Sequence, residues 1–369
     1  MPHWKTWLFS AIGIAEAQVD TIKRRIDDRW GNEPLLITAY DGFGTPARLT
    51  LTGRVLEAPE LRPPAADDSV WRNLANMYRR FESDEIPGAC VRASFSGTNY
   101  DAQADKEGFF TVELTPPEPL PANQLWHTIA LELLTPPAPA NGRVQTTGRV
   151  LVPPPAARFG IISDIDDTVI RTNATSLIGT VRSTLLANAY TRLPFPGVAA
   201  FYRALHGAGT NPLFYVSSSP WNIYDMLSAT FALQGIPAGP LMLRNWGFEG
   251  RFELAFRHHD HKFAALARIL ETYPQLPFIL IGDSGQEDPE IYREVVQRFP
   301  GRILTTYIRN VTPASATRTA AIQALARELQ AQGNTLLLID DTLGAARHAQ
   351  TMGWISAADL GEVAVAMNK

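Results

Sequence analysis

Residues 159 to 168 read Phe-Gly-Ile-Ile-Ser-Asp-Ile-Asp-Asp-Thr, an apolar run that ends in a group of acidic residues. A short apolar run of this kind is typical of a buried strand, and such strands usually end in turn residues. Crowded carboxylates must be solvated, paired or bound to a cation. The stretch therefore predicts a buried strand with a chemical role at its carboxyl end. An acidic turn or a cap on the next helix is the simpler alternative.

The spacing of the acids indicates which chemistry is possible. Alternate residues of an extended strand share a face, so Asp164 and Asp166 can point to one side while Asp167 points away. One carboxylate of such a pair can attack while the other transfers protons. Two close carboxylates resist joint ionisation unless a cation neutralises them, and their hard oxygen ligands suit Mg2+.

After Pro153-Pro154-Pro155, which we interpret as a rigid spacer, apolar strands alternate with helical stretches. This pattern predicts an α/β domain over residues 156–369 with a doubly wound parallel sheet. The expected strands are Phe159 to Ser163, Leu213 to Val216, Phe278 to Gly282, Arg302 to Ile308 and Thr335 to Ile339. The expected helices lie near 198–208, 221–234, 262–272, 289–299, 318–332 and 343–352.

Residues 35–152 have a different sequence pattern, in which short runs of alternating apolar and polar residues are separated by polar turns. Several short strands without a helical period predict an all-β sandwich. Asp67 to Ser83 reads as a helical or irregular insertion in this domain. The expected strands are Leu35 to Tyr40, Arg48 to Leu56, Ala89 to Phe95, Phe109 to Leu114, Thr128 to Leu134 and Val144 to Val152.

Residues 1–34 form the third predicted unit, one amphipathic helix whose apolar residues recur every three or four positions. The apolar stripe comprises Trp4, Leu8, Ala11, Ala15, Val19, Ile22 and Ile26. Such a stripe usually packs on the body of a protein, which is the interpretation we favour. The alternative is a helix on a membrane surface, with its aromatic residues at the headgroups and its basic residues against anionic lipid.

Composition limits the classes of function. The chain has 369 residues, 45% of them hydrophobic, which is enough for two folded domains. Its 33 basic and 37 acidic residues give a net charge of −4, so the chain lacks the basic excess of a nucleic-acid-binding protein. The single cysteine, Cys90, excludes an intramolecular disulfide and a cysteine zinc cluster. We expect a cytoplasmic protein, with peripheral attachment at the inner membrane surface as the alternative.

Polar residues also end or flank the other predicted strands. Ser217-Ser218-Ser219-Pro220 follows the second strand, where hydroxyls and helix-opening amides can hold a phosphoryl oxygen. Asp283 and Asp288 follow the third strand. Lys262 opens a predicted helix ahead of that strand and can place an ammonium over a transferred phosphate. Because ligands bind at the carboxyl ends of the strands in such sheets, these residues predict one site.

The order of these motifs resembles that of the haloacid dehalogenase (HAD) superfamily of phosphatases. Asp164-Ile165-Asp166-Asp167-Thr168 matches its first motif, Ser217 its second and Lys262 its third. Gly282, Asp283 and Asp288 match its fourth motif. Longer phrases resemble a narrower family, the phosphatidate phosphatases first known from an actin-patch protein and distantly similar to lipins. Those phrases are the strand at Asp164, Phe195 to Val198, Tyr215 to Trp221 and Gly282 to Tyr292.

The resemblance implies a role for each matched residue. Asp164 would attack phosphorus to form an aspartyl phosphate, and Asp166 would act as the general acid and base. The Asp164 carboxylate, the Asp166 carbonyl and Asp283 would hold Mg2+, with Asp288 orienting the metal ligands. Ser217 and Lys262 would hold the phosphoryl oxygens, and Thr168 the nucleophile loop. The further expected substrate contacts are Ser218, Ser219 and Arg171.

The interval between the first two motifs bears on the size of the substrate. Many relatives carry a cap domain, whereas here the interval from Val169 to Val216 holds only one additional stretch, Asn173 to Leu193. A lightly capped site suits a bulky substrate. The first hypothesis is a Mg2+-dependent phosphatidate phosphatase that releases diacylglycerol and phosphate. The second is the same chemistry on a soluble or protein phosphoester, and the third is a binding or scaffold protein with an inactive catalytic half.

Overall fold

The computed structural model describes residues 34–57, 85–121, 123–137, 142–170, 194–244 and 256–368. Four sequence predictions lie outside these residues. They are the amphipathic helix before residue 34, the insertion from Asp67 to Ser83, the stretch from Asn173 to Leu193, and the expected substrate contact Arg171.

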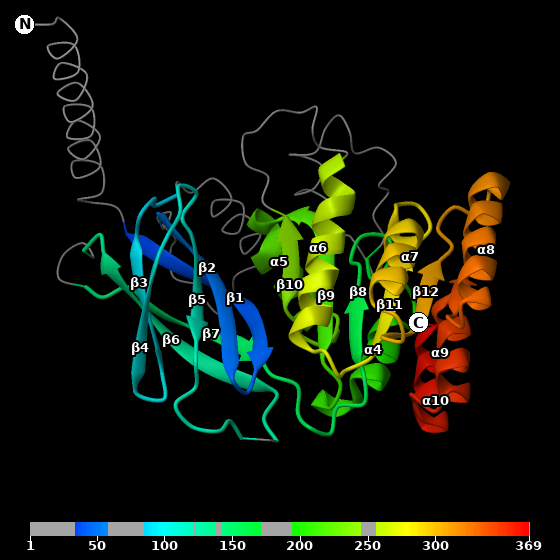
Figure 1. Ribbon diagram of the computed structural model, residues 1–369, viewed down its shortest axis with the longest axis horizontal. Coiled ribbons are helices and arrows are strands. Elements are labelled where there is room, and N and C mark those ends of the chain that lie inside the picture. The colour runs from blue at the N-terminus through cyan, green and yellow to red at the C-terminus, as the bar shows by residue number, and fades with distance from the viewer. Residues whose placement is uncertain are drawn as a thin grey trace, which may run out of the picture.

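The first half of the described chain is an all-β domain of seven strands (Figure 1). They are β1 (Leu35–Thr45), β2 (Arg48–Glu57), β3 (Cys90–Phe95), β4 (Thr98–Gln103), β5 (Phe109–Leu114), β6 (Trp126–Thr135) and β7 (Gln145–Leu151). Side chains along β6 alternate between buried and exposed positions, as expected for a sheet with one face on a core. The predicted all-β domain is therefore confirmed.

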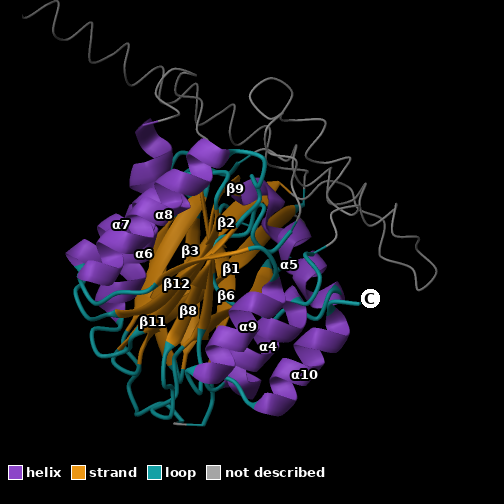
Figure 2. Cartoon of the chain, turned by 90° about the vertical axis from the view of Figure 1, so that its right-hand side faces the viewer, coloured by secondary structure: helices purple, strands orange, loops and turns teal. Residues whose placement is uncertain are grey.

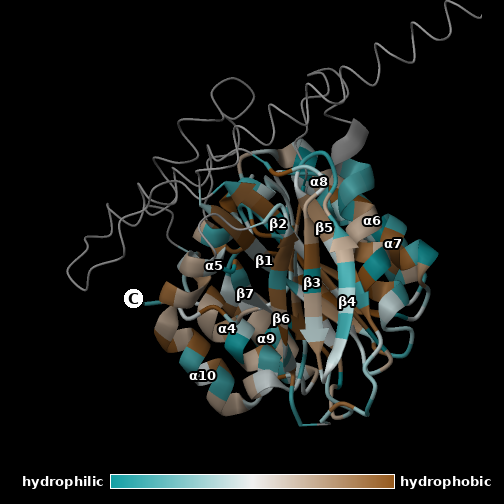
Figure 3. Ribbon diagram, turned by 90° about the vertical axis from the view of Figure 1, so that its left-hand side faces the viewer, coloured by the Kyte–Doolittle hydropathy of each residue, from teal (hydrophilic) through white to brown (hydrophobic). Residues whose placement is uncertain are grey.

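The arrangement of these strands differs from the predicted sandwich of two sheets. All seven form one hydrogen-bonded sheet in the order β4-β3-β6-β7-β1-β2-β5. The sheet curls so that its two edge strands come close, and the Tyr100 hydroxyl at β4 donates to the Thr115 carbonyl oxygen just after β5 at 2.5 Å. Strand β4 was not predicted, because it is hydrophilic along most of its length and lacks an apolar alternation (Figure 3).

The second half is a parallel α/β sheet in the order β10-β9-β8-β11-β12-β13, which confirms the predicted class. Its strands are β8 (Gly160–Ser163), β9 (Leu213–Pro220), β10 (Leu241–Arg244), β11 (Phe278–Asp283), β12 (Ile303–Arg309) and β13 (Leu336–Ile339). Its helices are α4 (Val198–His206), α5 (Tyr224–Leu233), α6 (Phe256–Thr272), α7 (Asp288–Arg298), α8 (Ala316–Ala331), α9 (Thr342–Thr351) and α10 (Ala357–Ala366). Strand β10 and helix α10 were not predicted.

Helices cover both faces of this parallel sheet (Figure 2). One core forms where α4, α5, α9 and α10 pack on one face, and a second where α6, α7 and α8 pack on the other. Both faces of the central strand β8 are thus covered, which explains why its four residues are all buried and read as an uninterrupted apolar run. Among the described residues, every helix is too short or too polar to span a bilayer.

Aromatic side chains join the β domain to the α/β domain. The ring of Tyr40 in β1 stacks on Trp221, with centroids 4.4 Å apart, and lies 4.7 Å from the ring of Tyr224. The Tyr224 hydroxyl accepts a hydrogen bond from the Asp41 amide at 2.8 Å. A second contact joins Phe43 to Phe214 at 5.6 Å. Trp221 follows directly on β9, so the β domain packs against the segment that leaves this strand.

We expect Tyr40→Ala to lower the free energy of unfolding by about 3–5 kcal/mol, because the buried ring would leave a cavity between the two domains. Urea unfolding followed by tryptophan fluorescence measures the change. The control is Tyr100→Ala at the sheet edge, where the side chain is only half-buried and a smaller loss is expected. Equal losses in the two variants would contradict a special role for the Tyr40 cluster.

Candidate active site

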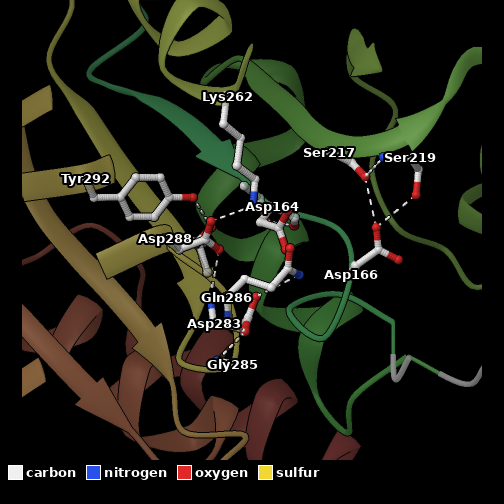
Figure 4. A network of polar contacts seen from close by, with 12 residues as sticks. Asp164, Asp166, Ser217, Ser219, Lys262, Asp283, Gly285, Gln286, Asp288 and Tyr292 are labelled. Carbon is white, nitrogen blue, oxygen red and sulfur yellow. Dashed lines mark hydrogen bonds and ion pairs between the residues drawn. The ribbon is translucent and has the colours of Figure 1, made fainter. Parts of the chain in front are cut away.

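The candidate site lies at the carboxyl edge of the parallel sheet, where β8, β9 and β11 end side by side (Figure 4). Asp164 follows the central strand β8, Ser217 lies near the end of β9, and Asp283 ends β11. Since β8 lies between the other two strands, Asp164 is flanked by both. The sheet therefore brings together polar residues that are more than a hundred positions apart in the chain.

Three buried carboxylates meet at this edge. Oxygens of Asp164, Asp283 and Asp288 lie within 4.8 Å of one another, and each residue is at most 1% exposed. The ammonium of Lys262 enters between two of them, with Nζ 2.8 Å from Asp164 Oδ1 and 2.5 Å from Asp288 Oδ1. Lys262 is itself buried. One ammonium offsets only part of the negative charge that three ionised carboxylates carry, so the arrangement would favour a further cation.

Burial and the neighbouring charges together shift the pKa values of the cluster. Burial raises the pKa of Asp164 well above its ordinary value; Lys262 opposes the shift, and the neighbouring acids add to it. Burial also raises the pKa of Asp283 to about 7, with a further contribution from Asp288. For Lys262, burial favours a lower pKa, but the two carboxylates outweigh it and raise the pKa above its ordinary value. The two neighbouring carboxylates therefore favour the charged form of Lys262.

The turn after β11 fixes Asp283 and Asp288. Asp283 Oδ1 accepts hydrogen bonds from the amides of Gly285 at 2.6 Å and Gln286 at 3.0 Å. Asp288 Oδ2 accepts from the Asp283 amide at 3.1 Å. Gly282 is needed for this approach, because a Cβ atom at that position would lie 2.5 Å from Asp288 Oδ2. The two carboxylates are thus held by the backbone of one short turn.

Asp166 forms a separate group with two serines. Its Oδ2 atom accepts hydrogen bonds from the hydroxyls of Ser217 and Ser219, both at 2.9 Å. The Ser217 hydroxyl oxygen also accepts from the Ser219 amide at 3.0 Å. Strand β8 ends at Ser163, so alternation along a strand does not set the directions of the two predicted carboxylates. Figure 4 shows Asp166 turned to the serines and Asp164 turned to Lys262.

Three further residues were predicted to belong to the site: Thr168, Ser218 and Lys262. Thr168 is buried in the turn after Asp167, whose φ of +56° lies in the left-handed region. The Thr168 hydroxyl has no hydrogen-bond partner among the residues that the structure describes. Ser218 lies between the two serines that contact Asp166 and is half-buried. Lys262 does not open a helix as predicted, because α6 begins at Phe256 and Lys262 lies further along it.

The carboxylate cluster fits a metal ion. Asp164 Oδ2 is buried and accepts no hydrogen bond from any described residue, although a buried carboxylate oxygen normally has a partner. Together with Asp283 and Asp288 it provides carboxylate oxygens of the kind that hard divalent cations prefer. Asp164, Asp283 and Asp288 can therefore hold a metal ion. The Asp166 carboxylate is not in this group of three.

Some residues around the site were not singled out from the sequence. Tyr202 shares a hydrogen bond of 2.6 Å with Ser163, directly before Asp164. The side-chain amide of Gln286 donates to Asp283 Oδ2 at 3.3 Å, and the Tyr292 hydroxyl donates to the Ile281 carbonyl oxygen at 2.9 Å. Gln286 lies within the fourth motif and was open to prediction. Tyr202 lies on a helix with no local signal of a polar role.

Comparisons with known proteins agree with the placement of the site. Residues 159–310 match the family model described as the catalytic domain of phosphatidate phosphatase APP1. The chain is 32% identical over 151 residues to phosphatidate phosphatase APP1 of Saccharomyces cerevisiae, a match that covers 41% of this chain and 26% of that protein. It is 31% identical over 155 residues to an uncharacterized protein of Schizosaccharomyces pombe, covering 42% of this chain and 25% of that protein.

The chain thus spans about a quarter of the length of these two relatives. Among solved structures, a carbohydrate acetylesterase from Xanthomonas citri is 12% identical, with a TM-score of 0.25 over 80% of this chain and 73% of the other. That TM-score is too low to indicate a shared fold. The matched segment begins at Phe159 and ends just after β12, so it contains every residue of the carboxylate cluster.

Proposed function

We propose that this chain, whose residues 159–310 belong to the family of the phosphatidate phosphatase APP1 catalytic domain, hydrolyses phosphate monoesters with the help of a bound divalent cation. The observation that carries the proposal is the buried cluster of Asp164, Asp283 and Asp288 at the end of the central strands. Three buried carboxylates beside a single lysine are costly for a purely structural arrangement. A cation and an anionic substrate account for that cost.

In the first step, a carboxylate oxygen of Asp164 attacks phosphorus and the bond to the ester oxygen breaks. Asp166 gives its proton to the departing alkoxide. In the second step, water attacks the phosphorus of the aspartyl phosphate, Asp166 takes a proton from that water, and phosphate leaves with Asp164 regenerated. Asp164 suits the role of nucleophile because it directly follows the central strand β8, between the groups contributed by both neighbouring strands.

Other side chains hold the reacting groups. Lys262 keeps the Asp164 carboxylate in one orientation and offers positive charge to the phosphoryl oxygens. The Ser217 hydroxyl serves as a phosphoryl contact once substrate replaces Asp166 as its partner. Ser219 keeps the Asp166 carboxylate in place, so we assign it a positioning role in addition to substrate contact. Thr168 supports the nucleophile loop from within the turn.

Asp164, Asp283 and the Asp166 backbone carbonyl would hold Mg2+, with Asp288 orienting them. When bound, the ion offsets the repulsion between an anionic nucleophile and an anionic phosphoester. The hard oxygen ligands and the unpartnered Asp164 Oδ2 support this assignment. The chain's own contribution is to keep these ligands fixed and shielded from water.

For the substrate we propose phosphatidate, which would yield diacylglycerol and phosphate. The matched relative from Saccharomyces cerevisiae is a phosphatidate phosphatase, which supports a lipid substrate here. We propose a cytoplasmic protein that reaches its substrate by peripheral contact with the inner membrane surface. The same chemistry on a soluble or protein phosphoester is the alternative, and a non-catalytic scaffold would leave the carboxylate cluster without an explanation.

The proposal is tested by measuring phosphate release from mixed micelles of phosphatidate and comparing it with phosphate release from a panel of soluble phosphoesters. We expect the highest kcat/KM for phosphatidate, and loss of activity toward every substrate in the presence of EDTA, with recovery on addition of excess Mg2+. A preference for soluble substrates would replace the lipid assignment with the alternative. Absence of phosphatase activity on all substrates, including a generic aryl phosphate, would defeat the enzymatic assignment altogether.

A further inference from the structure

Arg318 of α8 reaches the turn that carries Asp283 and Asp288. Its Nε donates to the Ser284 carbonyl oxygen at 2.8 Å, and its Nη2 donates to the Gln286 carbonyl oxygen at 2.5 Å. The same guanidinium pairs with both carboxylate oxygens of Glu290, at 2.5 and 3.0 Å. One side chain thus joins the turn after β11 to the first part of α7.

The bonded groups lie next to those that orient the carboxylates. The carbonyls held by Arg318 belong to Ser284 and Gln286, while the amides of Gly285 and Gln286 hold Asp283 Oδ1. Glu290 lies two residues after Asp288 in the first turn of α7. Fixing the turn and the helix start against each other therefore fixes the separation of Asp283 and Asp288.

We propose that Arg318 is a positioning residue for the metal site, acting by clamping the turn from Asp283 to Gln286 against α7. The proposal rests on the cation binding argued above. Arginine suits the task because its planar fork donates in several directions at once, whereas a lysine ammonium lacks this fixed geometry. The residue lies outside the segment that matches the APP1 family model, so this clamp is contributed by a later part of the chain.

Charge and geometry predict opposite effects for loss of this arginine. Its positive charge lies near Asp283 and Asp288, so removing the charge alone would strengthen the binding of a cation. Releasing the turn would weaken binding, because groups that orient metal ligands contribute roughly 10- to 100-fold in affinity. The sign of the change therefore distinguishes a positioning role from a purely electrostatic one.

Arg302 provides a matched control. It is also half-buried, and its Nη2 donates to three backbone carbonyl oxygens, those of Leu270, Tyr273 and Leu276. It precedes β12 and therefore lies at the amino edge of the sheet, opposite the carboxylate cluster. We expect its removal to disturb the local backbone in a comparable way without touching the metal site.

The experiment measures Mg2+ binding to the metal-free protein by isothermal titration calorimetry, for the wild type, Arg318→Ala, Arg318→Lys and Arg302→Ala. We expect both Arg318 variants to bind Mg2+ at least about tenfold more weakly, and Arg302→Ala to stay within about twofold of the wild type. Hydrogen exchange without metal is measured in parallel, and amides from Gly285 to Glu287 should exchange faster in the Arg318 variants only.

The outcomes separate this proposal from the proposed function. Unchanged or tighter Mg2+ binding in Arg318→Ala would overturn the clamp while leaving a metal-dependent phosphatase intact. A wild-type protein that binds no Mg2+ would overturn the metal dependence. In that case hydrogen exchange would test the clamp alone: unchanged exchange of the amides from Gly285 to Glu287 in the Arg318 variants would overturn it. Equal weakening by Arg302→Ala would reduce Arg318 to a general contributor to stability and would also overturn the clamp.

Discussion

Replacing Asp164 by Asn is expected to lower kcat by roughly 10^4-fold or more while leaving the fold intact. An amide oxygen is a poor nucleophile, so the aspartyl phosphate cannot form. The substitution preserves side-chain volume and an oxygen that accepts a hydrogen bond from Lys262.

Phosphate release under saturating substrate measures this loss, and circular dichroism with thermal unfolding checks the fold. Asp101→Asn is the matched control, because Asp101 pairs with Arg92 on the exposed face of the β domain. We expect that variant to keep wild-type activity. If Asp164→Asn retained more than about one hundredth of the activity, another nucleophile would be needed and the two-step mechanism would be wrong.

The α/β domain was open to prediction because its strands are buried on both faces. Strand β8 and its neighbours β9 and β11 read as apolar runs, and each is followed by polar residues that mark its carboxyl end. Strand β10 escaped prediction because its apolar run, Leu241 to Leu243, is only three residues long, whereas β13, an edge strand of the same length, is apolar throughout. The β domain was predicted by class, but a sequence period does not report whether strands join one curled sheet or two packed sheets.

The sequence indicated which residues gather at the edge of the sheet, but not how their side chains are grouped there. Chain order placed Asp164, Ser217, Lys262 and Asp283 at one edge of the sheet, and the structure brings them there. The division into a carboxylate group and a separate group around Asp166 depends on side-chain directions after β8 ends. Arg318 had no local sequence signal, because two of its partners are backbone carbonyls and the third, the Glu290 carboxylate, lies 28 residues away in the chain.

Lys262→Met is expected to have the second large effect, this time on stability. The substitution keeps a long unbranched side chain but leaves Asp164 and Asp288 buried without their ammonium. Removing one partner of a buried charge pair costs about 3–5 kcal/mol, because the remaining charge is neither solvated nor paired. Urea unfolding at neutral pH in the presence of EDTA measures this loss. Activity should fall at the same time, since the phosphoryl oxygens lose a positive contact.

Magnesium should return part of the stability that Lys262→Met loses. The ion binds the same carboxylates in the folded state, so excess Mg2+ stabilises that state by linkage, and more strongly where no ammonium competes. The variant should therefore gain more unfolding free energy from Mg2+ than the wild type does, while its activity stays low. Lys106→Met, in an exposed turn of the β domain, should change stability by less than about 0.5 kcal/mol with or without the ion. An equal gain from Mg2+ in the variant and the wild type would mean that the lysine and the cation do not share the carboxylates of Asp164 and Asp288.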